Sequence, residues 1–239
     1  MSAIEVALKE RRTVARDTIT VLFEKPAGFT FKGGQSVDLT LINPPRNDDK
    51  GTKRALSIVS APHEKYLQFA TRVRDSAFKQ TLRDMPLGTK AQIEGPFGSM
   101  TLHSNKSRRA IIIAGGIGIT PFMSMLRHAA HTNLEHSLSL IYSNRKPEDA
   151  PFLEELQKIE RERRGSFQLV ATMDGPADPK WSGRVGMINA ELIESVRVPP
   201  AMPIFYIAGP PAMVAAMRGI LSGMGVEDDD IRSEDFSGY

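Results

Sequence analysis

The stretch Ala110-Ile111-Ile112-Ile113-Ala114-Gly115-Gly116-Ile117-Gly118-Ile119-Thr120-Pro121 decides the fold class of this 239-residue chain. Residues 110–114 are apolar without alternation, which is typical of a parallel strand covered on both faces. Pro121 suits the first turn of a helix, so residues 121–130 are predicted to be helical. A glycine turn between such a strand and helix offers free backbone amides to a pyrophosphate. The alternative is a tight turn that serves only packing.

The same strand-helix pattern repeats along the C-terminal half. Four such units imply a doubly wound parallel sheet, an α/β fold whose strand ends form a ligand crevice. A second glycine turn, Ala208-Gly209-Pro210-Pro211, follows the last apolar strand, and two such turns can face one dinucleotide. The further strands and helices are predicted at 137–142 with 151–163, 167–173 with 188–195, and 204–208 with 212–221.

The N-terminal half has a different pattern, with short alternating runs separated by turn residues. This pattern predicts antiparallel strands that close into a small β-barrel. A short helix at 77–83 is expected to plug one end of the barrel. The basic stretch at 103–109 marks the boundary, so the predicted domains are residues 1–104 and 105–239. The clearest strand runs are 18–23, 36–41, 67–70 and 91–94.

Composition limits the classes of function. Hydrophobic residues make up 41% of the chain and charged residues 25%, and no apolar run suggests a membrane span, so we expect a soluble protein. Residues 1–12 are too charged for the apolar core of a secretory signal, so we expect the protein in the cytoplasm. The absence of cysteine excludes disulfides, thiolate metal sites and cysteine-ligated iron–sulfur clusters. A net charge of +3 permits an acidic partner. Nucleic acid is not expected, because basic and aromatic residues do not alternate.

The tetrapeptide Arg54-Ala55-Leu56-Ser57 lies at the head of a predicted barrel strand. We expect the Arg54 guanidinium and the Ser57 hydroxyl on one face of that strand. A guanidinium pairs bidentately with pyrophosphate, and a serine hydroxyl hydrogen-bonds a flavin ring nitrogen. Taken alone, an exposed arginine at a barrel edge is a common surface feature. The order of motifs along the chain is therefore needed to distinguish a flavin contact from an ordinary surface arginine.

Five motifs in order resemble those of the ferredoxin-NADP reductase superfamily. The resemblance covers nearly the whole chain, and the ordered set is specific although its single members are not. It implies a six-stranded antiparallel flavin barrel followed by an α/β domain that binds a nicotinamide dinucleotide. The motifs are Arg54-Ala55-Leu56-Ser57, Gly95-Pro96-Phe97-Gly98, the glycine turn at 115–121, Ala208-Gly209-Pro210-Pro211 and Glu234-Asp235-Phe236.

The resemblance also implies cofactors and residue roles. FAD is the implied flavin, with Arg54 on its phosphate and Ser57 near its N5 atom, where hydride enters. Ser57, Thr120 and Phe236 are the implied catalytic residues, with Phe236 covering the flavin ring. The other implied flavin contacts are Ala55, Leu56, Thr71, Arg72, Ser76, Ala77, Phe78 and Lys79. The implied dinucleotide contacts are Gly115, Gly116, Gly118, Thr120, Pro121, Gly209 and Pro210.

The sequence departs from the family pattern at three points. Leu56 stands where the family has tyrosine or phenylalanine, so flavin stacking would be aliphatic and affinity lower. Ala208 replaces the cysteine of plant-type members, and the plant-type terminal tyrosine is not reproduced, because Phe236 is followed by Ser237-Gly238-Tyr239. These two differences resemble a bacterial-type member. Without cysteine the chain carries no ferredoxin module, so the acceptor is expected to be another molecule.

The resemblance implies an NAD(P)H-dependent flavoprotein reductase that passes electrons to an acceptor protein. The expected acceptors are a ferredoxin, a flavodoxin or an oxygenase component, docking on a basic surface for which Arg108 and Arg109 are candidates. One alternative is a flavin reductase that uses free flavin as substrate, which Leu56 favours. Another is a non-catalytic dinucleotide-binding redox sensor.

The identity of the nicotinamide donor depends on residues 142–149, where such folds meet the adenosine ribose. Asn144 and Arg145 are the candidate contacts there. Arg145 would pair with a 2′-phosphate, whereas Glu148 or Asp149 would accept a hydrogen bond from a free 2′-hydroxyl. Because Arg145 lies nearest the strand end, NADPH is favoured over NADH, with the two acids expected to begin the next helix.

The five histidines show no spacing that suits a metal site, so we expect them on the surface and expect no metal.

Overall fold

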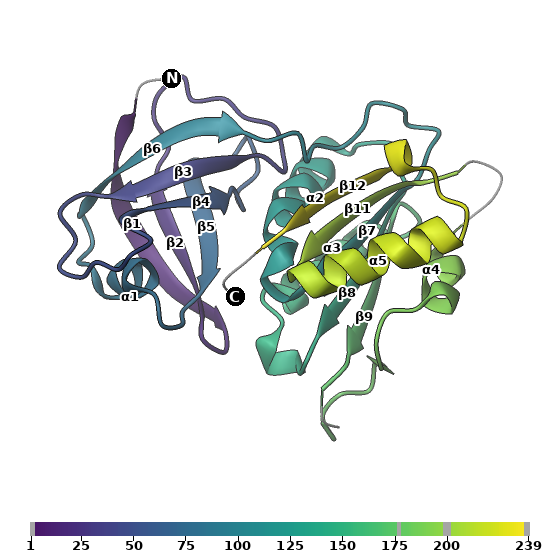
Figure 1. Ribbon diagram of the computed structural model, residues 1–239. Coiled ribbons are helices and arrows are strands. Elements are labelled where there is room, and N and C mark those ends of the chain that lie inside the picture. Colours follow the sequence, from purple (N-terminus) through teal and green to yellow (C-terminus); the bar gives the residue numbers. More distant parts are fainter. Residues whose placement is uncertain (1–2, 176–177, 198–201, 237–239) are drawn as a thin grey trace. The chain divides into compact units, whose positions relative to one another are not determined.

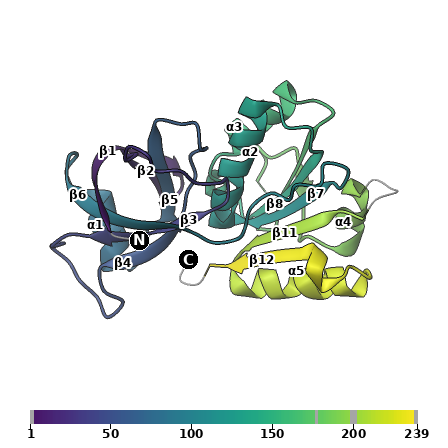
Figure 2. The ribbon, with the colours of Figure 1, turned by 90° about the horizontal axis from the view of Figure 1, so that it is seen from above.

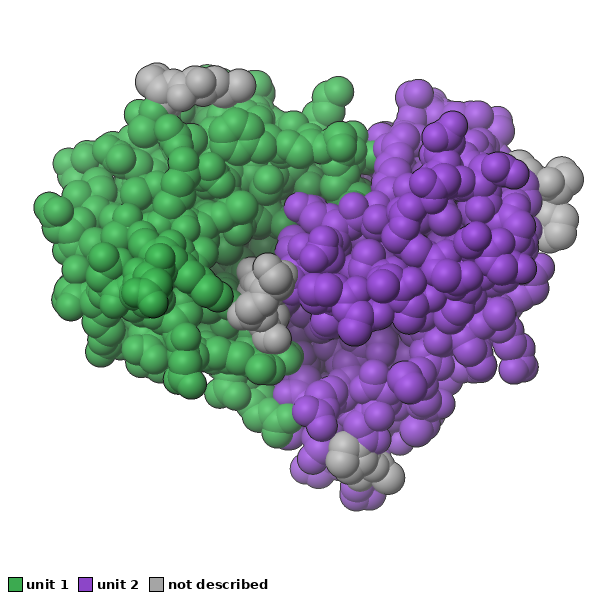
Figure 3. All heavy atoms as spheres, viewed as in Figure 1, with its two compact units in different colours: residues 1–101, 120–128 green, residues 102–119, 129–239 purple. Residues whose placement is uncertain are grey.

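The computed structural model describes residues 3–175, 178–197 and 202–236. They form two compact units (Figure 3): residues 1–101 with 120–128, and residues 102–119 with 129–239. Helix α2 (Thr120–Thr132) therefore contributes its first residues to the first unit. Within that unit, the Ser124 hydroxyl donates a hydrogen bond to the Ser60 carbonyl at 2.6 Å.

Unit 1 contains a six-stranded antiparallel sheet in the order β4-β3-β6-β1-β2-β5 (Figure 1). The amide of Val59, just beyond β4, donates to the carbonyl of Gln68 on β5 at 2.8 Å, which joins the two ends of the sheet. The predicted barrel is thereby confirmed. Its strands are β1 (Ile4–Ala15), β2 (Thr18–Glu24), β3 (Ser36–Leu41), β4 (Lys53–Ser57), β5 (Tyr66–Arg72) and β6 (Lys90–Phe97).

Alternation of apolar and polar residues produces the core of the barrel. On β3, Val37, Leu39 and Leu41 are buried while the residues between them are half-buried, as a strand with one covered face requires. Helix α1 (Ala77–Asp84) places Phe78 and Leu82 in the same core. Its bounds agree with the predicted helix to within one residue.

Unit 2 is built on a six-stranded parallel sheet in the order β10-β9-β8-β7-β11-β12. Helices α4 (Ala190–Val196) and α5 (Pro211–Gly223) cover one face, and α3 (Leu153–Glu162) lies on the other (Figure 2). The doubly wound fold is therefore confirmed. The strands are β7 (Ala110–Gly115), β8 (Leu138–Asn144), β9 (Phe167–Met173), β10 (Arg184–Val185), β11 (Ile204–Gly209) and β12 (Ile231–Asp235).

The strand order reverses between β7 and β11. From β7 the sheet extends through β8 and β9 on one side and through β11 and β12 on the other. All these strands are parallel, so their carboxyl ends meet at one edge. The edge beside such a reversal is where open α/β sheets bind ligands.

Two histidines contradict the expected surface location. His103 is 7% exposed and His136 is 5% exposed. The Nδ1 atom of His103 lies 2.9 Å from the Tyr206 hydroxyl, and Nε2 of His136 lies 2.8 Å from the His103 carbonyl. Hydrogen bonds inside unit 2 thus offset part of the cost of burying the two rings, and burial lowers the pKa of His103.

Within the described parts of the chain, no group of three or more histidine, cysteine or acidic residues is arranged to hold a metal ion. No helix among the described segments combines the length and apolar character needed to cross a membrane.

Candidate functional site

A cluster of positive charges surrounds the start of helix α1. Lys79 on this helix is 7% exposed. Burial, and after it the positive charges of Arg54, Arg74, Lys50 and Arg72, together lower the pKa of Lys79 to about 8. We refer to these five residues as the barrel cation cluster. Crowded and partly buried cations destabilise one another unless an anion lies among them. The cluster therefore has the electrostatic character of an anion-binding site.

Arg54 is held firmly within this cluster, with 18% of its side chain exposed. Its Nη1 atom donates to the carbonyls of Lys50 at 2.7 Å and Gly51 at 3.0 Å. Its Nη2 atom donates to Asp48 Oδ1 at 3.2 Å. The guanidinium also lies over the Phe78 ring, 5.2 Å from the centroid. These contacts orient a planar cation at the head of α1, as recognition of a phosphate requires.

The amides at the start of α1 complete the anion site. The Ser76 hydroxyl accepts from the Lys79 amide at 3.5 Å, which caps the helix. The Ala77 amide donates to Asp48 Oδ2 at 2.9 Å. This hydrogen bond is the main reason why the pKa of Asp48 lies below its usual range. The predicted contacts Arg54, Ser76, Ala77 and Lys79 thus lie together, around a carboxylate that the sequence analysis missed.

The expected common face of Arg54 and Ser57 is wrong. Strand β4 pairs with β3 in regular register, with Arg54 opposite Leu39 and Ser57 opposite Ser36. Side chains alternate along a strand, so residues three positions apart point to opposite faces. Leu56, on the same face as Arg54, is 5% exposed and belongs to the core of the barrel.

The remaining barrel candidates have different environments. Ala55 is exposed on β4, on the same face as Ser57. Thr71 on β5 is 1% exposed, and its Oγ1 atom has no hydrogen-bond partner among the described residues. Arg72 is half-buried at the end of β5 and belongs to the barrel cation cluster. Arg72 is therefore the one of these three that the structure brings to the anion site.

The two glycine turns of unit 2 pack closely against each other. A Cβ atom on Gly118 would lie 2.2 Å from the Ala208 carbonyl oxygen and 2.7 Å from Gly209 Cα. A Cβ atom on Gly115 would lie 3.2 Å from Pro210 Cδ. At Gly118, only glycine permits this approach of backbone to backbone. The structure thus brings together four of the predicted dinucleotide contacts.

Gly116 faces open space. It opens the 3₁₀ helix η1 (Gly116–Ile119) with a φ of +55°, and nothing lies within 4 Å of the position of its missing Cβ. Helix α2 then begins at Thr120, with Pro121 in its first turn and no capping hydrogen bond from a side chain in the described structure. Thr120 itself is buried. A glycine with positive φ followed by a helix start without a side-chain cap is typical of phosphate-binding turns.

The other predicted contacts of unit 2 lie at the carboxyl ends of strands. Asn144 ends β8 and is 5% exposed, with both side-chain polar atoms unpaired among the described residues. Arg145 next to it is exposed. Glu148 and Asp149 form the 3₁₀ helix η2 (Pro147–Asp149) and do not begin α3, which corrects that expectation. An α-helix starts only after Phe152, which has a left-handed backbone conformation.

Phe236 follows strand β12, and its amide donates to the Gly209 carbonyl at 2.9 Å. It therefore lies beside the second glycine turn.

The candidate docking arginines are engaged inside unit 2. Arg108 donates to Asp230 at 2.8 Å and to the Met202 carbonyl at 2.7 Å, and Arg109 donates to the Ser139 hydroxyl at 2.7 Å. Arg108 thus has a structural role.

The chain is similar to known oxidoreductases over most of its length. A family model described as the oxidoreductase NAD-binding domain matches residues 112–219. A ferredoxin–NADP reductase B from Sorangium cellulosum is 31% identical over 84% of this chain and 84% of that protein. A ferredoxin NADP⁺ reductase structure from Neisseria gonorrhoeae, with bound FAD and NADP, has a TM-score of 0.82 at 23% identity and covers 98% of this chain and 99% of that one.

Other curated relatives are longer. The reductase component of propane 2-monooxygenase from Rhodococcus jostii is 27% identical over 89% of this chain, which spans 57% of that protein. The chain spans 51% of an NADH-cytochrome b5 reductase 1 from Coccidioides immitis. Because the Sorangium relative is matched over most of both sequences, the chain belongs to the ferredoxin-NADP reductase family of oxidoreductases.

Proposed function

We propose that this protein is an NAD(P)H-dependent flavoprotein reductase that passes electrons through FAD to a separate acceptor protein. The observation that carries the proposal is the barrel cation cluster at the start of α1, in a chain of this family. A flavin adenine dinucleotide presents two phosphates, which suit several crowded cations better than the single phosphate of FMN does. The NAD-binding family model over residues 112–219 supports the nicotinamide donor.

The residues present fit a bound FAD. Arg54 and the Ala77 amide already hold a carboxylate, so their geometry accepts an anionic oxygen. Bound FAD would supply the conversion of a two-electron donor into one-electron steps. Within unit 1, Arg54 and Lys79 would hold the flavin phosphates. Ser57, on the other face of β4 from Arg54, would offer its hydroxyl to the flavin ring.

Within unit 2, the chain's own backbone binds the hydride donor. The backbone amides of the 3₁₀ helix that Gly116 opens would hold the pyrophosphate, because the position of the missing Gly116 Cβ faces open space. The close packing of Gly118 against Ala208 keeps the turn in place. Phe236 would border the nicotinamide, and Asn144 and Arg145 would contact the adenosine ribose at the end of β8. Thr120, which belongs to unit 1, is a separate proposed contact of the nicotinamide.

The acceptor is proposed from the relatives. The similar proteins from Rhodococcus jostii and Chromohalobacter salexigens are reductase components of monooxygenases, and the Sorangium relative is a ferredoxin–NADP reductase. An oxygenase component, a ferredoxin or a flavodoxin is therefore the proposed partner. The flavin domain is proposed to end near residue 104, where the pattern of the sequence changes.

Anaerobic visible spectroscopy tests the proposal. The purified protein is expected to show flavin absorbance that bleaches on addition of NADPH or NADH. Flavin released by heat and separated by chromatography should be FAD. Flavin absorbance that neither nicotinamide bleaches would instead favour the non-catalytic redox sensor.

A flavin reductase that uses free flavin as substrate is the second candidate. Two observations favour it: Leu56 is buried in the core of the barrel, and Asp48 already holds donors that a flavin phosphate needs. Gel filtration separates the candidates. Yellow colour that stays with the protein supports the bound-cofactor enzyme, and colourless protein that still oxidises NAD(P)H when flavin is added supports the second.

Ser57→Ala is expected to slow flavin reduction while leaving the fold and FAD affinity nearly unchanged. A hydroxyl that stabilises charge at the flavin N5 acts mainly in the transition state, so the loss should be roughly five- to tenfold. Stopped-flow bleaching by excess NADPH measures the rate. Ser36→Ala is the matched control, since Ser36 is the partner of Ser57 across the β3–β4 pair. A rate within about twofold of the parent corresponds to less than roughly 0.5 kcal/mol and would reject the role.

Arg145→Ala is expected to raise the Michaelis constant for NADPH by roughly tenfold and that for NADH much less, because one charged contact to the 2′-phosphate is lost. Steady-state kinetics with both donors measures the effect. Arg164→Ala is the control, since Arg164 is also exposed but precedes the amino end of β9, at the opposite edge of the sheet. Equal effects on both donors, or a parent that prefers NADH, would contradict the assignment.

A further inference from the structure

We propose that Asp48 limits the affinity of the flavin site. Its carboxylate competes with the flavin phosphate for Arg54 and for the first amide of α1. The inference rests on the proposed FAD site and goes beyond it, because it names the residue that sets how tightly the flavin is held. Asp48 lies in the loop between β3 and β4, residues 42–52, directly before the Arg54 motif.

Three donors converge on this one carboxylate. Its Oδ2 atom accepts from the Ala77 amide at 2.9 Å. Its Oδ1 atom accepts from Arg54 Nη2 at 3.2 Å and from the Lys50 amide at 3.0 Å. A backbone amide has a single hydrogen, so the Ala77 amide cannot serve Asp48 and a phosphate with full strength at the same time. Binding of a phosphate at this point therefore requires an exchange of partners.

The charge of Asp48 adds to the competition. The hydrogen bond from Ala77 lowers the pKa of Asp48, as do the Lys50 amide and the positive charge of Arg54. The carboxylate thus stays ionised at neutral pH, and it would repel a phosphate placed beside it. The barrel cation cluster acts in the opposite sense, because its positive charges attract a phosphate. The site thus attracts a polyanion while Asp48 limits its affinity.

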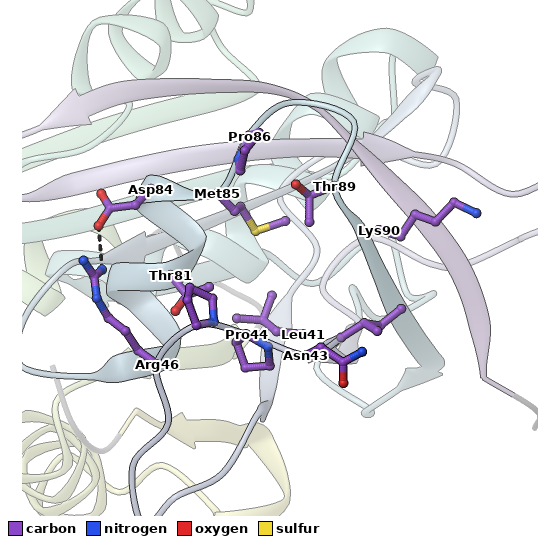
Figure 4. Close-up of a pocket in the computed structure, with 12 residues that line it drawn as sticks. Leu41, Asn43, Pro44, Arg46, Thr81, Asp84, Met85, Pro86, Thr89 and Lys90 are labelled. Atoms are coloured by element: carbon purple, nitrogen blue, oxygen red, sulfur yellow. Dashed lines mark hydrogen bonds and ion pairs between the residues drawn. The ribbon is translucent and has the colours of Figure 1, made fainter.

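The loop that carries Asp48 is attached to both ends of α1. At the carboxyl end, Arg46 pairs with Asp84 at 2.6 Å, beside a cavity of about 290 Å³ (Figure 4). At the amino end, the attachment is Asp48 itself. The loop therefore keeps a second, more exposed contact with α1 when the charge of Asp48 is removed. Substitutions of Asp48 are therefore expected to report the effect of its carboxylate and not a displacement of the whole loop.

Two substitutions of Asp48 test the competition with the flavin phosphate in two steps. Asp48→Asn keeps an acceptor for the Ala77 amide but removes the charge, and Asp48→Ala removes both. Both are expected to tighten FAD binding to apoprotein, Asp48→Asn by about fivefold and Asp48→Ala by about tenfold or more, since charge-assisted contacts to phosphate are strengthened. Quenching of flavin fluorescence during titration with FAD measures affinity, and calorimetric titration with ADP isolates the diphosphate part of the site.

Asp49→Asn is the matched control, because Asp49 is the next residue, is exposed and undergoes the same change of charge. It should leave FAD affinity within about twofold of the parent, as expected for a solvated charge. Thermal unfolding of each apoprotein shows whether the variants fold. Loss of the contact to Ala77 should lower the midpoint in Asp48→Ala more than in Asp48→Asn.

Unchanged or weakened FAD affinity in both folded Asp48 variants would overturn the inference and make Asp48 a residue that positions Arg54. Tightening in Asp49→Asn equal to that in Asp48→Asn would also overturn it, because net charge alone would then explain the effect. A parent apoprotein that binds neither FAD nor ADP would reject the proposed flavin site itself, and the inference with it. A parent whose FAD binding depends on Arg54 but not on Asp48 rejects the inference alone.

Discussion

Arg54→Ala is expected to weaken FAD binding to the apoprotein by roughly 10- to 150-fold, which corresponds to about 1.5–3 kcal/mol for a charge-assisted contact. The expected loss of FAD affinity is large because Arg54 is the oriented cation of the site, held over Phe78 and against the carbonyl of Gly51. Flavin retained through gel filtration gives a first measure. Titration of the apoprotein with FAD gives the dissociation constant.

Arg46→Ala is the control for this substitution. Arg46 lies in the same loop and forms an ion pair with Asp84 in which both side chains are more than 40% exposed. Such surface pairs contribute little, so FAD affinity should stay within about twofold of the parent. Thermal unfolding of the Arg54 variant is needed as well, because Arg54 also donates to backbone carbonyls. An Arg54→Ala protein with lowered thermal stability but unchanged FAD affinity would make the residue structural and sink the assignment.

The parallel sheet of unit 2 was the most predictable part of the fold. Strands β7 and β11 consist of apolar residues without alternation, and both of their faces are covered. A run of this kind between helices has few alternatives to a central parallel strand. The reversal of strand order between β7 and β11 did not follow from the sequence, because it depends on contacts between distant segments.

Polar strands were harder to predict. Strand β12 reads Ile-Arg-Ser-Glu-Asp, and only Ile231 in it is buried. It is a strand because it pairs in parallel with β11. Strand β1 extends to Ala15 through the charged residues 9–12, although its buried apolar side chains are Val6 and Leu8. Pairing with a neighbour outweighs local propensity in such strands.

The candidate site was predicted in part. Order along the chain was enough to connect Arg54 with the start of α1, and the structure places both around one carboxylate. Asp48 was not predicted as a site residue, because nothing in the sequence around an acidic residue in a polar loop indicates a hydrogen bond with the distant Ala77. The prediction that Arg54 and Ser57 share a face of the strand was wrong. Side chains alternate between the two faces, so residues three positions apart lie on opposite faces.

Gly118→Ala is expected to destabilise unit 2 by about 1–3 kcal/mol, because the added methyl group must displace backbone. Its Cβ would lie 2.2 Å from the Ala208 carbonyl oxygen, and neither segment ends in a flexible side chain that could move away. Displacement of this turn should also raise the Michaelis constants for NADPH and NADH by a similar factor, unlike Arg145→Ala. Thermal unfolding and steady-state kinetics with both donors measure the two effects.

Gly219→Ala is the matched control, with the same chemical change in the same unit. Gly219 lies exposed within helix α5, and nothing is found within 4 Å of its missing Cβ. Alanine is the better helix former, so this variant should be as stable as the parent or more stable by up to roughly 1 kcal/mol. A Gly118→Ala protein that unfolds at the parent's temperature and keeps both Michaelis constants would show that the two turns can separate without loss. The close packing of the turns would then have no part in holding the dinucleotide, and the amides around Gly116 would have to bind it alone.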